Sequence, residues 1–376
     1  MSAEIAATVH GGRETELRRS SALQLNRLAA ACLGLGLLAG SGCRSLGPGT
    51  VKRDRMHYAT AVADSWKEQL LLNIIKTRFA DAPAFLEVAS VVSGYSLETG
   101  VSLDGQFSPE SLRGDTFAAA GVSGRYTDRP TISYSPMTGE RYARSLIAPA
   151  PLEAVLFVMQ GGAPADFILG LMVQSIEGHH NLSLLAGRFQ PADPQFTKLL
   201  QALRALQQAH VIESEITKEG DRVEVWIQFH AIAASTPGMA EQVAGVKALL
   251  GIPSQLDRVK VLFGTLNPDP GVMAIRTRSL MQILSTLGAG VQIPQDHPSH
   301  GSAIPLDPSL APQGFTVHSG KEKPAEAFVA VPYEGLWFWI DRRDLSSKTT
   351  LAAVTLLFNF LEGGDKVSPV LTIPTN

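Results

Sequence analysis

The chain has 376 residues, of which 45% are hydrophobic and 18% are charged. This is the composition of a globular protein that can bury one large core or two smaller ones, and it excludes disorder along the whole chain. The formal net charge is −3 at pH 7 and no long run of Lys and Arg occurs, which excludes the basic face of a nucleic-acid-binding protein.

The first 42 residues differ from the rest of the sequence. The uncharged stretch LAAACLGLGLLAG at residues 28–40 is preceded by four arginines, Arg13, Arg18, Arg19 and Arg27. A charged region followed by an apolar one is typical of a secretion signal. The apolar stretch is too short to cross a bilayer, which takes about 20 helical residues. The pattern therefore predicts a signal peptide over residues 1–42 that is removed from the mature protein.

Cys43 comes directly after the small residues AGSG at positions 39–42. Small side chains at these places fit the groove of a peptidase that cuts just before the cysteine. The stretch resembles the lipobox of bacterial lipoproteins. The resemblance implies that the Cys43 thiol receives a diacylglycerol, that the signal is removed, and that the new amino terminus is acylated. The alternatives are an apolar segment that is not cleaved and a signal that is cut elsewhere.

Lipidation would determine where the protein resides. Cys32 falls within the predicted signal, so Cys43 is the only cysteine of the mature chain and no internal disulfide is expected. Several acyl chains, each contributing about 0.8 kcal/mol per buried CH₂, would hold the chain permanently to membrane lipid. In lipoproteins of enteric-type bacteria an aspartate after the cysteine favours the inner membrane. Arg44 stands there in this chain, so the resemblance implies the outer membrane.

Two short segments, RYTDRPTISYSP at 125–136 and WFWIDRRDLSSK at 337–348, resemble stretches of uncharacterised proteobacterial lipoproteins of unknown function. This resemblance implies a location in the bacterial cell envelope and brings no activity with it.

The mature chain is expected to begin with a flexible tether over residues 43–53, because Gly, Pro and charged residues are frequent there. Residues 56–79 then have the apolar spacing of an amphipathic helix that ends at Pro83. Its apolar face contains Ala59, Val62, Trp66, Leu70, Leu71, Asn73, Ile74, Ile75, Thr77 and Phe79. This face would pack on its own domain, with a partner or a membrane surface as the alternative occupant.

Segments with strand patterns follow the first helix. Residues 85–103 alternate with turn signals, and residues 131–142 contain Pro136, Thr138 and Gly139, which predict a hairpin turn. A small, mostly antiparallel sheet is therefore expected in this part of the chain.

Helices are predicted over residues 152–160, 193–210 and 238–250, and a fourth is predicted from Ser279 to Gly288 with a capping box to Gln282. A hairpin with Gly220 in its turn spans 211–229, and a strand covers 258–264. Residues 166–178 fit either a helix or a buried strand.

The C-terminal part begins after a proline-rich stretch at 294–326, which predicts a long surface loop or linker. Strands are expected at 327–333 and 336–341, followed by a helix over 347–361 and a last strand at 370–374. The strand LWFWI is apolar on both faces and so should lie in the interior of a sheet.

These elements predict an α+β fold with mixed, largely antiparallel sheets and packed helices. Residues 54–293 form the main region, and residues 327–376 form a strand-helix-strand region packed on it. Two interlocked lobes are expected, with one elaborated domain as the alternative.

Few residues suggest a catalytic or metal-binding site. The segment 314–321 has the wrong spacing for a phosphate loop, and the usual serine hydrolase and zinc protease motifs are absent from the sequence. One metal site is conceivable at Asp296, His297 and His300, with His318 as a further ligand. A solvated polar loop is the favoured interpretation, because Pro298 prevents the helical spacing that would make the two histidines diagnostic.

Three other polar clusters have structural explanations. His179 and His180 suit a turn, and Asp341, Arg342, Arg343 and Asp344 suit a charged connection from strand to helix rather than an acid-base pair. A ligand or peptidoglycan groove is conceivable where tyrosines and arginines alternate, but packing on a sheet surface is the simpler account. Its residues would be Tyr126, Tyr134, Tyr142, Arg125, Arg129 and Arg144.

The sequence thus predicts a lipid-anchored cell-envelope protein that acts as a binding or assembly factor, with no cofactor, no assigned catalytic residue and a protein partner in the envelope. The alternative is an envelope hydrolase or metal-binding enzyme that uses the loop around His297 and His300, which would require a deep pocket there.

Overall fold

The computed structural model describes residues 46–92, 95–106, 117–128, 131–185, 188–220, 222–230, 238–294, 301–306, 311–312 and 314–362. The predicted signal over 1–42, Cys43 and the predicted strand at 370–374 lie outside these ranges. The chain divides into two units. The described part of the first is 46–58 with the β2 and β3 strands, and the second takes nearly all other elements.

The first unit contains one two-stranded sheet. Strands β2 (Tyr95–Gln106) and β3 (Phe117–Asp128) pair with each other. Residues 46–58, the beginning of helix α2, belong to the same unit.

Helix α2 (Leu46–Arg78) is longer than the sequence predicts, since residues 46–53 are helical and not a flexible tether. Pro48 falls in the first turn, where its missing N–H costs no intrahelical hydrogen bond. Extending an existing helix is also far easier than nucleating one. The predicted apolar face is buried in the second half of the helix, where Leu71, Ile74 and Ile75 are fully enclosed.

Helix α2 ends at Arg78, five residues before the proline that was expected to end it. Ala80 adopts a left-handed conformation with φ of 58°, and the Asp81 N–H donates to the Lys76 carbonyl at 2.9 Å. Reversal by one left-handed residue is a common helix ending, although glycine usually supplies it. Pro83 therefore lies in the extended segment that leads to the next strand.

The predicted hairpin turn at 136–139 is wrong. Strand β4 (Thr131–Pro136) pairs antiparallel with β1 (Leu86–Val92), from Leu86 opposite Pro136 to Val92 opposite Thr131. Helix α3 (Gly139–Ile147) begins where the turn was expected. Gly139 has φ of 86°, so its conformational freedom serves a helix start and not a strand reversal.

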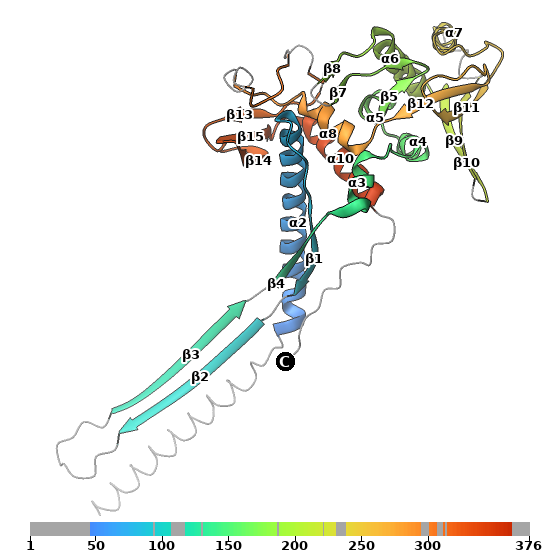
Figure 1. Ribbon diagram of the computed structural model, residues 1–376. Coiled ribbons are helices and arrows are strands. Elements are labelled where there is room, and N and C mark those ends of the chain that lie inside the picture. The colour runs from blue at the N-terminus through green and yellow to red at the C-terminus, as the bar shows by residue number, and fades with distance from the viewer. Residues whose placement is uncertain are drawn as a thin grey trace, which may run out of the picture. The chain divides into compact units, whose positions relative to one another are not determined.

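The largest described sheet of the second unit has six strands in the order β6-β5-β12-β11-β10-β9 (Figure 1). All its neighbouring pairs are antiparallel except β11 with β12. Its strands are β5 (Val173–Ile176), β6 (His179–His180), β9 (Ile212–Glu219), β10 (Arg222–Phe229), β11 (Arg258–Phe263) and β12 (Val272–Thr277).

Helices cover one face of this sheet. They are α4 (Leu152–Gln160), α5 (Ala165–Met172), α6 (Pro194–Gln208) and α7 (Met239–Leu249). The covered face buries Val225, Val259, Val261, Met273 and Ile275. The segment that fitted either a helix or a strand is both, because α5 passes directly into β5 at Val173.

The opposite face of β9, β10 and β11 carries charges around an aromatic ring. Trp226 lies under the Arg258 guanidinium at 4.3 Å and the Lys260 ammonium at 5.6 Å. Glu215 pairs with Arg258 at 2.8 Å, and Glu224 pairs with Lys260 at 2.6 Å. Alternation along the strands therefore separates an apolar, helix-covered face from a polar one.

Helix α8 (Leu280–Gly288) has the predicted capping box, in which Ser279 and Gln282 exchange hydrogen bonds between side chain and backbone. The small β7 (Ser183–Leu185) and β8 (Arg188–Gln190) pair with each other.

The C-terminal three-stranded sheet has the order β13-β15-β14. Its strands are β13 (His318–Gly320), β14 (Ala327–Tyr333) and β15 (Leu336–Asp341), and helix α10 (Leu345–Glu362) follows. The strand with apolar residues on both faces is the central one, as predicted. The expected loop is wrong over 315–320, because Phe315 and Val317 are buried and Val317 bridges to Val291.

Aromatic rings join α10 to α2 and to the segment before β1. The Phe358 ring lies 5.3 Å from Trp66 and 4.7 Å from Phe85, measured between ring centroids. Offset or tilted aromatic pairs at these distances add to the stabilisation from burial. The C-terminal helix and the first helix thus share one core.

Arg278 is the largest polar side chain in the core, and only 2% of it is exposed. Its guanidinium donates to the carbonyls of Gly170 at 2.9 Å, Leu171 at 3.0 Å and Leu182. Desolvation lowers the pKa of Arg278 to about 9. The arginine therefore supplies buried donors to the carbonyls of Leu171 near the end of α5 and Leu182 before β7, and it shares the Gly170 carbonyl with Asn181.

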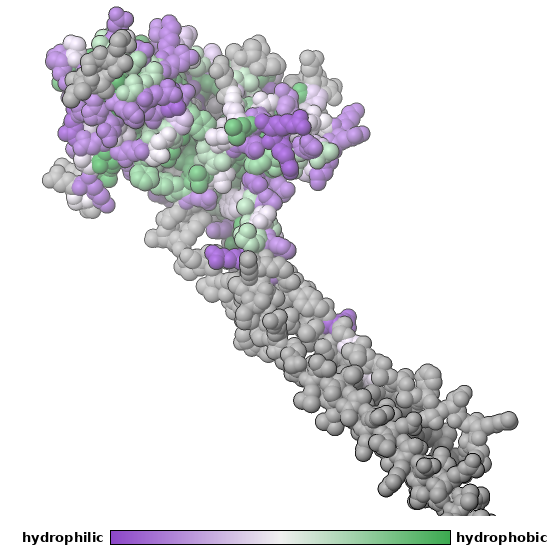
Figure 2. All heavy atoms as spheres, turned by 180° about the vertical axis from the view of Figure 1, so that it is seen from behind, coloured by the Kyte–Doolittle hydropathy of each residue, from purple (hydrophilic) through white to green (hydrophobic). Residues whose placement is uncertain are grey.

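The structure confirms the α+β class with mostly antiparallel sheets, and it does not confirm two interlocked lobes. In the described part of the chain, no helix is both long and apolar enough to cross a membrane. Figure 2 shows hydrophobic and hydrophilic residues interspersed on one face of the molecule.

Candidate functional site

The predicted lipidation site Cys43 and the predicted metal ligands Asp296, His297 and His300 lie outside the described residues. The proposed further ligand, His318, lies on β13. Its Nδ1 is 3.0 Å from Gln292 Oε1, and its ring is 5.7 Å from the Trp339 ring. Among the residues that the structure describes, no three His, Cys, Asp or Glu side chains are grouped to hold a metal ion.

The two neighbouring histidines of the sequence form β6, directly after the turn at Glu177 and Gly178. His179 Nδ1 lies 3.2 Å from Asp193 Oδ2, and its Nε2 lies 3.3 Å from the Leu249 carbonyl. Asp193 also caps α6. Its carboxyl accepts hydrogen bonds that lower its pKa, with the larger effect from the Gln195 N–H and a smaller one from His179. His179 therefore connects the start of α6 with the end of α7.

The tyrosines and arginines suggested for a ligand groove do not converge among the described side chains. Tyr142 donates to the Pro83 carbonyl at 3.0 Å, whereas Tyr134 is 60% exposed on β4. Arg144 pairs with Glu140 at 2.5 Å on an exposed part of α3. The side chain of Tyr126 and residue Arg129 lie outside the described part.

The charged group after β15 is a connection from strand to helix, as predicted. Asp341 accepts from the Arg343 N–H at 2.7 Å, and Asp344 accepts from the Ser347 N–H at 3.0 Å. The two carboxylates thus serve as turn and helix acceptors and not as an acid-base pair.

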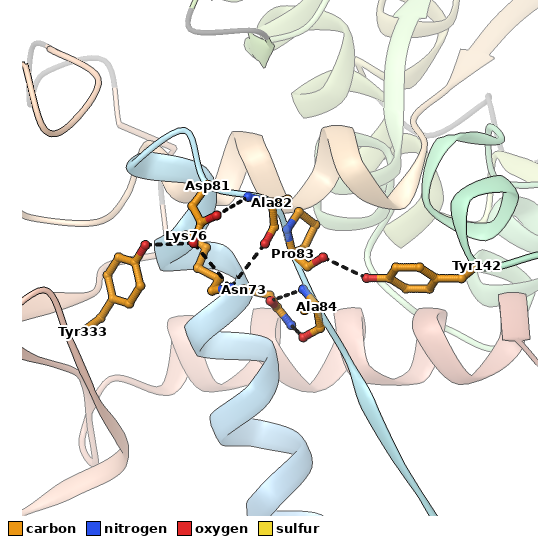
Figure 3. A network of polar contacts seen from close by, with 8 residues as sticks. All are labelled: Asn73, Lys76, Asp81, Ala82, Pro83, Ala84, Tyr142 and Tyr333. Carbon is orange, nitrogen blue, oxygen red and sulfur yellow. Dashed lines mark hydrogen bonds and ion pairs between the residues drawn. The ribbon is translucent and has the colours of Figure 1, made fainter. Parts of the chain in front are cut away.

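Side chains of α2 hold the extended segment 82–86 through its backbone, an arrangement we call the α2 ladder (Figure 3). Asn73 donates to the Ala84 carbonyl and accepts from its N–H, both at 2.8 Å. Gln69 does the same with Leu86, at 3.2 and 2.7 Å.

Lys76 adds a third rung to the α2 ladder by donating to the Ala82 carbonyl at 3.3 Å. The step from Gln69 to Asn73 is four helical residues, a rise of about 6 Å, and it matches the rise of about 6.6 Å over the two strand residues from Leu86 to Ala84. The step from Asn73 to Lys76 is three residues, about 4.5 Å, and the long lysine side chain reaches Ala82 from there. The side chains of α2 therefore act as a neighbouring strand for the residues that lead into β1.

Asp81 and Tyr333 form a hydrogen bond next to the Lys76 rung of the α2 ladder. Tyr333 donates to Asp81 Oδ2 at 3.0 Å, and Lys76 lies 3.4 Å from the same oxygen (Figure 3). The Tyr333 hydrogen bond lowers the pKa of Asp81, while burial and this hydrogen bond raise the pKa of Tyr333 to about 12. Both groups therefore keep their ordinary charge at neutral pH, and the network is structural.

The best candidate for a binding site is a polar groove beside the outermost strand β9, which we call the β9 groove. It has a volume of about 580 Å³. Its walls come from the ends of α4 and α6 and from β9 and β10. It is lined by Met159, Gln160, Gly162, Arg204, Gln207, Gln208, His210, Ile212, Glu213, Ser214, Ile227 and His230.

The ionisable groups of the β9 groove lie at its rim. His230 Nε2 is 3.1 Å from Glu213 Oε2, and both side chains are well exposed. Arg204 donates to Gln207 Oε1 at 2.9 Å. His210 has φ of 55° in the turn after α6, a strained conformation for this residue that places it beside the groove.

Within the described residues, Ser214 is not placed to act as a nucleophile beside the His230–Glu213 pair of the β9 groove. A histidine beside a carboxylate can act as a base, but it requires a nucleophile within hydrogen-bond reach. Ser214 follows Glu213 on β9 and so points to the other face of the sheet. Its hydroxyl faces the Leu156 carbonyl at 3.4 Å. The groove offers amide, guanidinium and backbone groups that can bind a ligand.

Sequence reasoning missed this groove, although one signal for it was present. The predicted hairpin over 211–229 has a histidine just outside each end, His210 and His230. Antiparallel pairing brings the two ends of a hairpin together, so both histidines are expected at the open end of this hairpin, where His230 pairs with Val211 next to His210. The contributions of α4 and α6 depend on tertiary packing and leave no comparable signal.

No known family model, curated protein or solved structure matches the chain.

Proposed function

We propose that the protein is a lipid-anchored binding protein of the bacterial cell envelope and that the β9 groove is its binding site. The observation that carries the location is the row of small residues 39–42 before Cys43, after an apolar stretch of signal length. Arg44 in place of aspartate favours the outer membrane over the inner one. Acylated Cys43 would hold the chain to membrane lipid.

A binding role fits the groove better than catalysis does. Its polar groups come from α4, α6, β9 and the two flanking histidines, and they leave an open, hydrogen-bonding surface around the apolar Ile212, Ile227 and Met159. Binding sites commonly combine an apolar floor with a few polar groups that orient the ligand. An enzyme built on His297 and His300 remains a prediction of the sequence alone.

The two cysteines offer a matched pair of variants for testing the anchor. In cells fed an alkyne-bearing fatty acid, we expect the Cys43→Ala variant to lose the lipid label. We expect Cys32→Ala to keep it, because the proposed cleavage removes that residue. Label that persists in Cys43→Ala would overturn the proposal, and so would label that disappears only in Cys32→Ala.

The binding role needs a separate measurement. We would crosslink intact cells, purify the full-length protein and identify the attached proteins by mass spectrometry, with Cys43→Ala as the control. An envelope protein recovered in constant proportion with the wild type, and lost from the control, is the expected result. Recovery of the lipidated protein with no partner would contradict an assembly role.

A further inference from the structure

Strand β9 is the last strand of the six-stranded sheet, so one of its edges has no neighbouring strand in the part of the chain that the structure describes. It pairs with β10 without a bulge, from Ile212 opposite Phe229 to Glu219 opposite Arg222. The His230 N–H donates to the Val211 carbonyl at 2.8 Å, so Val211 and His230 form a hydrogen-bonded pair of the β9–β10 ladder. In an antiparallel ladder, alternate residues direct their N–H and C=O groups to the same side.

Odd-numbered residues of β9 therefore direct their backbone groups to β10, and even-numbered residues direct theirs to the open edge. Within the described residues, the open edge receives one hydrogen bond, from Gln160 Nε2 to the Ser214 carbonyl at 2.5 Å. Gln160 is itself exposed. Its amide occupies the place that the N–H of an added strand would take. The open-edge residues are Ile212, Ser214, Ile216 and Lys218.

Natural sheets usually protect such an edge with a proline, a bulge or a covering element. Strand β9 has no proline and its register with β10 is unbroken. The β9 groove opens beside three consecutive residues of this strand, 212–214, which leaves space along the edge. An exposed edge beside a groove is the arrangement that binds peptides by strand addition.

The charges on β9 favour a basic partner over a second copy of this chain. Glu213 and Glu215 lie on the polar face of the sheet, with side chains 70% and 47% exposed. Antiparallel pairing of two β9 edges would bring these carboxylates close to those of the second copy, which is destabilising. Lysine or arginine at every second position of an added strand would instead face them.

We infer that the open edge of β9 binds an extended segment of a partner protein by strand addition, with basic residues alternating with small apolar ones. The basic residues face Glu213 and Glu215, and the apolar residues face the groove near Ile212. This inference rests on the proposed binding function and names the chemistry of the partner.

The test uses the full-length protein in nanodiscs of uncharged phosphatidylcholine and a fluorescent octapeptide of alternating lysine and valine. Fluorescence anisotropy measures binding, and hydrogen exchange locates it. We expect slower exchange in 212–219 with the peptide bound. The same peptide with N-methylated backbone amides should bind at least about tenfold more weakly, because it cannot donate hydrogen bonds to the outward carbonyls of β9. A glutamate-valine peptide should not bind.

Matched variants separate the backbone from the side chain at Lys218. We expect Lys218→Pro, which removes an outward N–H, to bind at least about tenfold more weakly than Lys218→Ala, which retains it. Gln160→Ala should bind more tightly than the wild type, since it removes the amide that competes for the Ser214 carbonyl. If Lys218→Pro does not fold, the N-methylated peptide on the wild type decides the question.

Equal binding of the N-methylated peptide would overturn the inference, as would protection that lies outside β9. A dimer of the wild type that Lys218→Pro dissolves would show that a second copy occupies the edge. The result is independent of lipidation, because Cys43→Ala in detergent should bind the peptide as the wild type does. Loss of the anchor and loss of peptide binding are thus separate outcomes.

Discussion

The α2 ladder allows one hydrogen-bonding pattern to be compared in two environments. Asn73 and Gln69 each donate one bond to a backbone carbonyl and accept one from an N–H of segment 84–86. Only 1% of Asn73 is exposed, whereas the Gln69 bonds lie at the surface. The substitutions Asn73→Asp and Gln69→Glu exchange one NH₂ group for oxygen at nearly constant shape.

The expected effects on stability differ because only one of the introduced charges is buried. In Asn73→Asp, a carboxylate oxygen would lie about 2.8 Å from the Ala84 carbonyl, so a hydrogen bond becomes a contact between two acceptors. Losing that bond costs about 1 kcal/mol, and the unpaired buried charge costs several more. We expect the free energy of unfolding to fall by about 3 to 4 kcal/mol for Asn73→Asp and by about 0.5 kcal/mol for Gln69→Glu.

Urea unfolding followed by tryptophan fluorescence measures both effects, since the Trp66 ring lies 5.3 Å from Phe358 and 6.2 Å from Phe85. Lowering the pH should reduce the loss in Asn73→Asp. The folded state raises the pKa of the introduced carboxyl, and the protonated form can donate to Ala84 again. Equal losses for the two variants at neutral pH, or a loss in Asn73→Asp that persists in acid, would refute the reasoning.

Three further predictions concern single contacts. Ser279→Ala removes the cap of α8 and should lower the free energy of unfolding by about 1 kcal/mol, measured by urea unfolding. Asp193→Asn keeps a cap acceptor for α6 but removes the charge beside His179. Because the folded state lowers the pKa of Asp193, the stability gap between wild type and variant should be full above about pH 4 and close as pH falls further. Tyr333→Phe should remove a tyrosine that ionises at a raised pKa of about 12 in an absorbance titration. The Tyr333 hydrogen bond to Asp81 should stabilise the fold below about pH 10 and be lost as pH rises toward the folded pKa of about 12.

Much of the secondary structure could be predicted because its signals are local. Asp193 and Pro194 mark the start of α6, Ser279 and Gln282 mark the start of α8, and Gly220 marks a hairpin turn. Each of these depends on residues within one turn of one another. The apolar face of α2 likewise repeats within its own segment.

Long-range contacts explain most of the rest. Strand β4 pairs with β1 across about 40 residues, and nothing near Pro136 indicates that partner. Phe315 and Val317 are buried within a proline-rich stretch. The prolines of that stretch predict a loop, and two alternating apolar residues are too short a signal to indicate a strand. Gly290 allows that segment to approach, since a side chain there would collide with the Phe315 backbone. The β9 groove also brings together elements that are distant in the sequence.

The α2 ladder also determines how the protein would respond to mechanical load. Its three rungs, from Gln69, Asn73 and Lys76, run along the helix and each crosses to the extended chain beside it. Tension applied along α2 would strain the rungs simultaneously in shear, so that they share the force and fail together. Pulling β1 away from the helix would instead open them one after another, at a lower force for each. A chain tethered at Cys43 would therefore be most resistant to forces directed along its first helix.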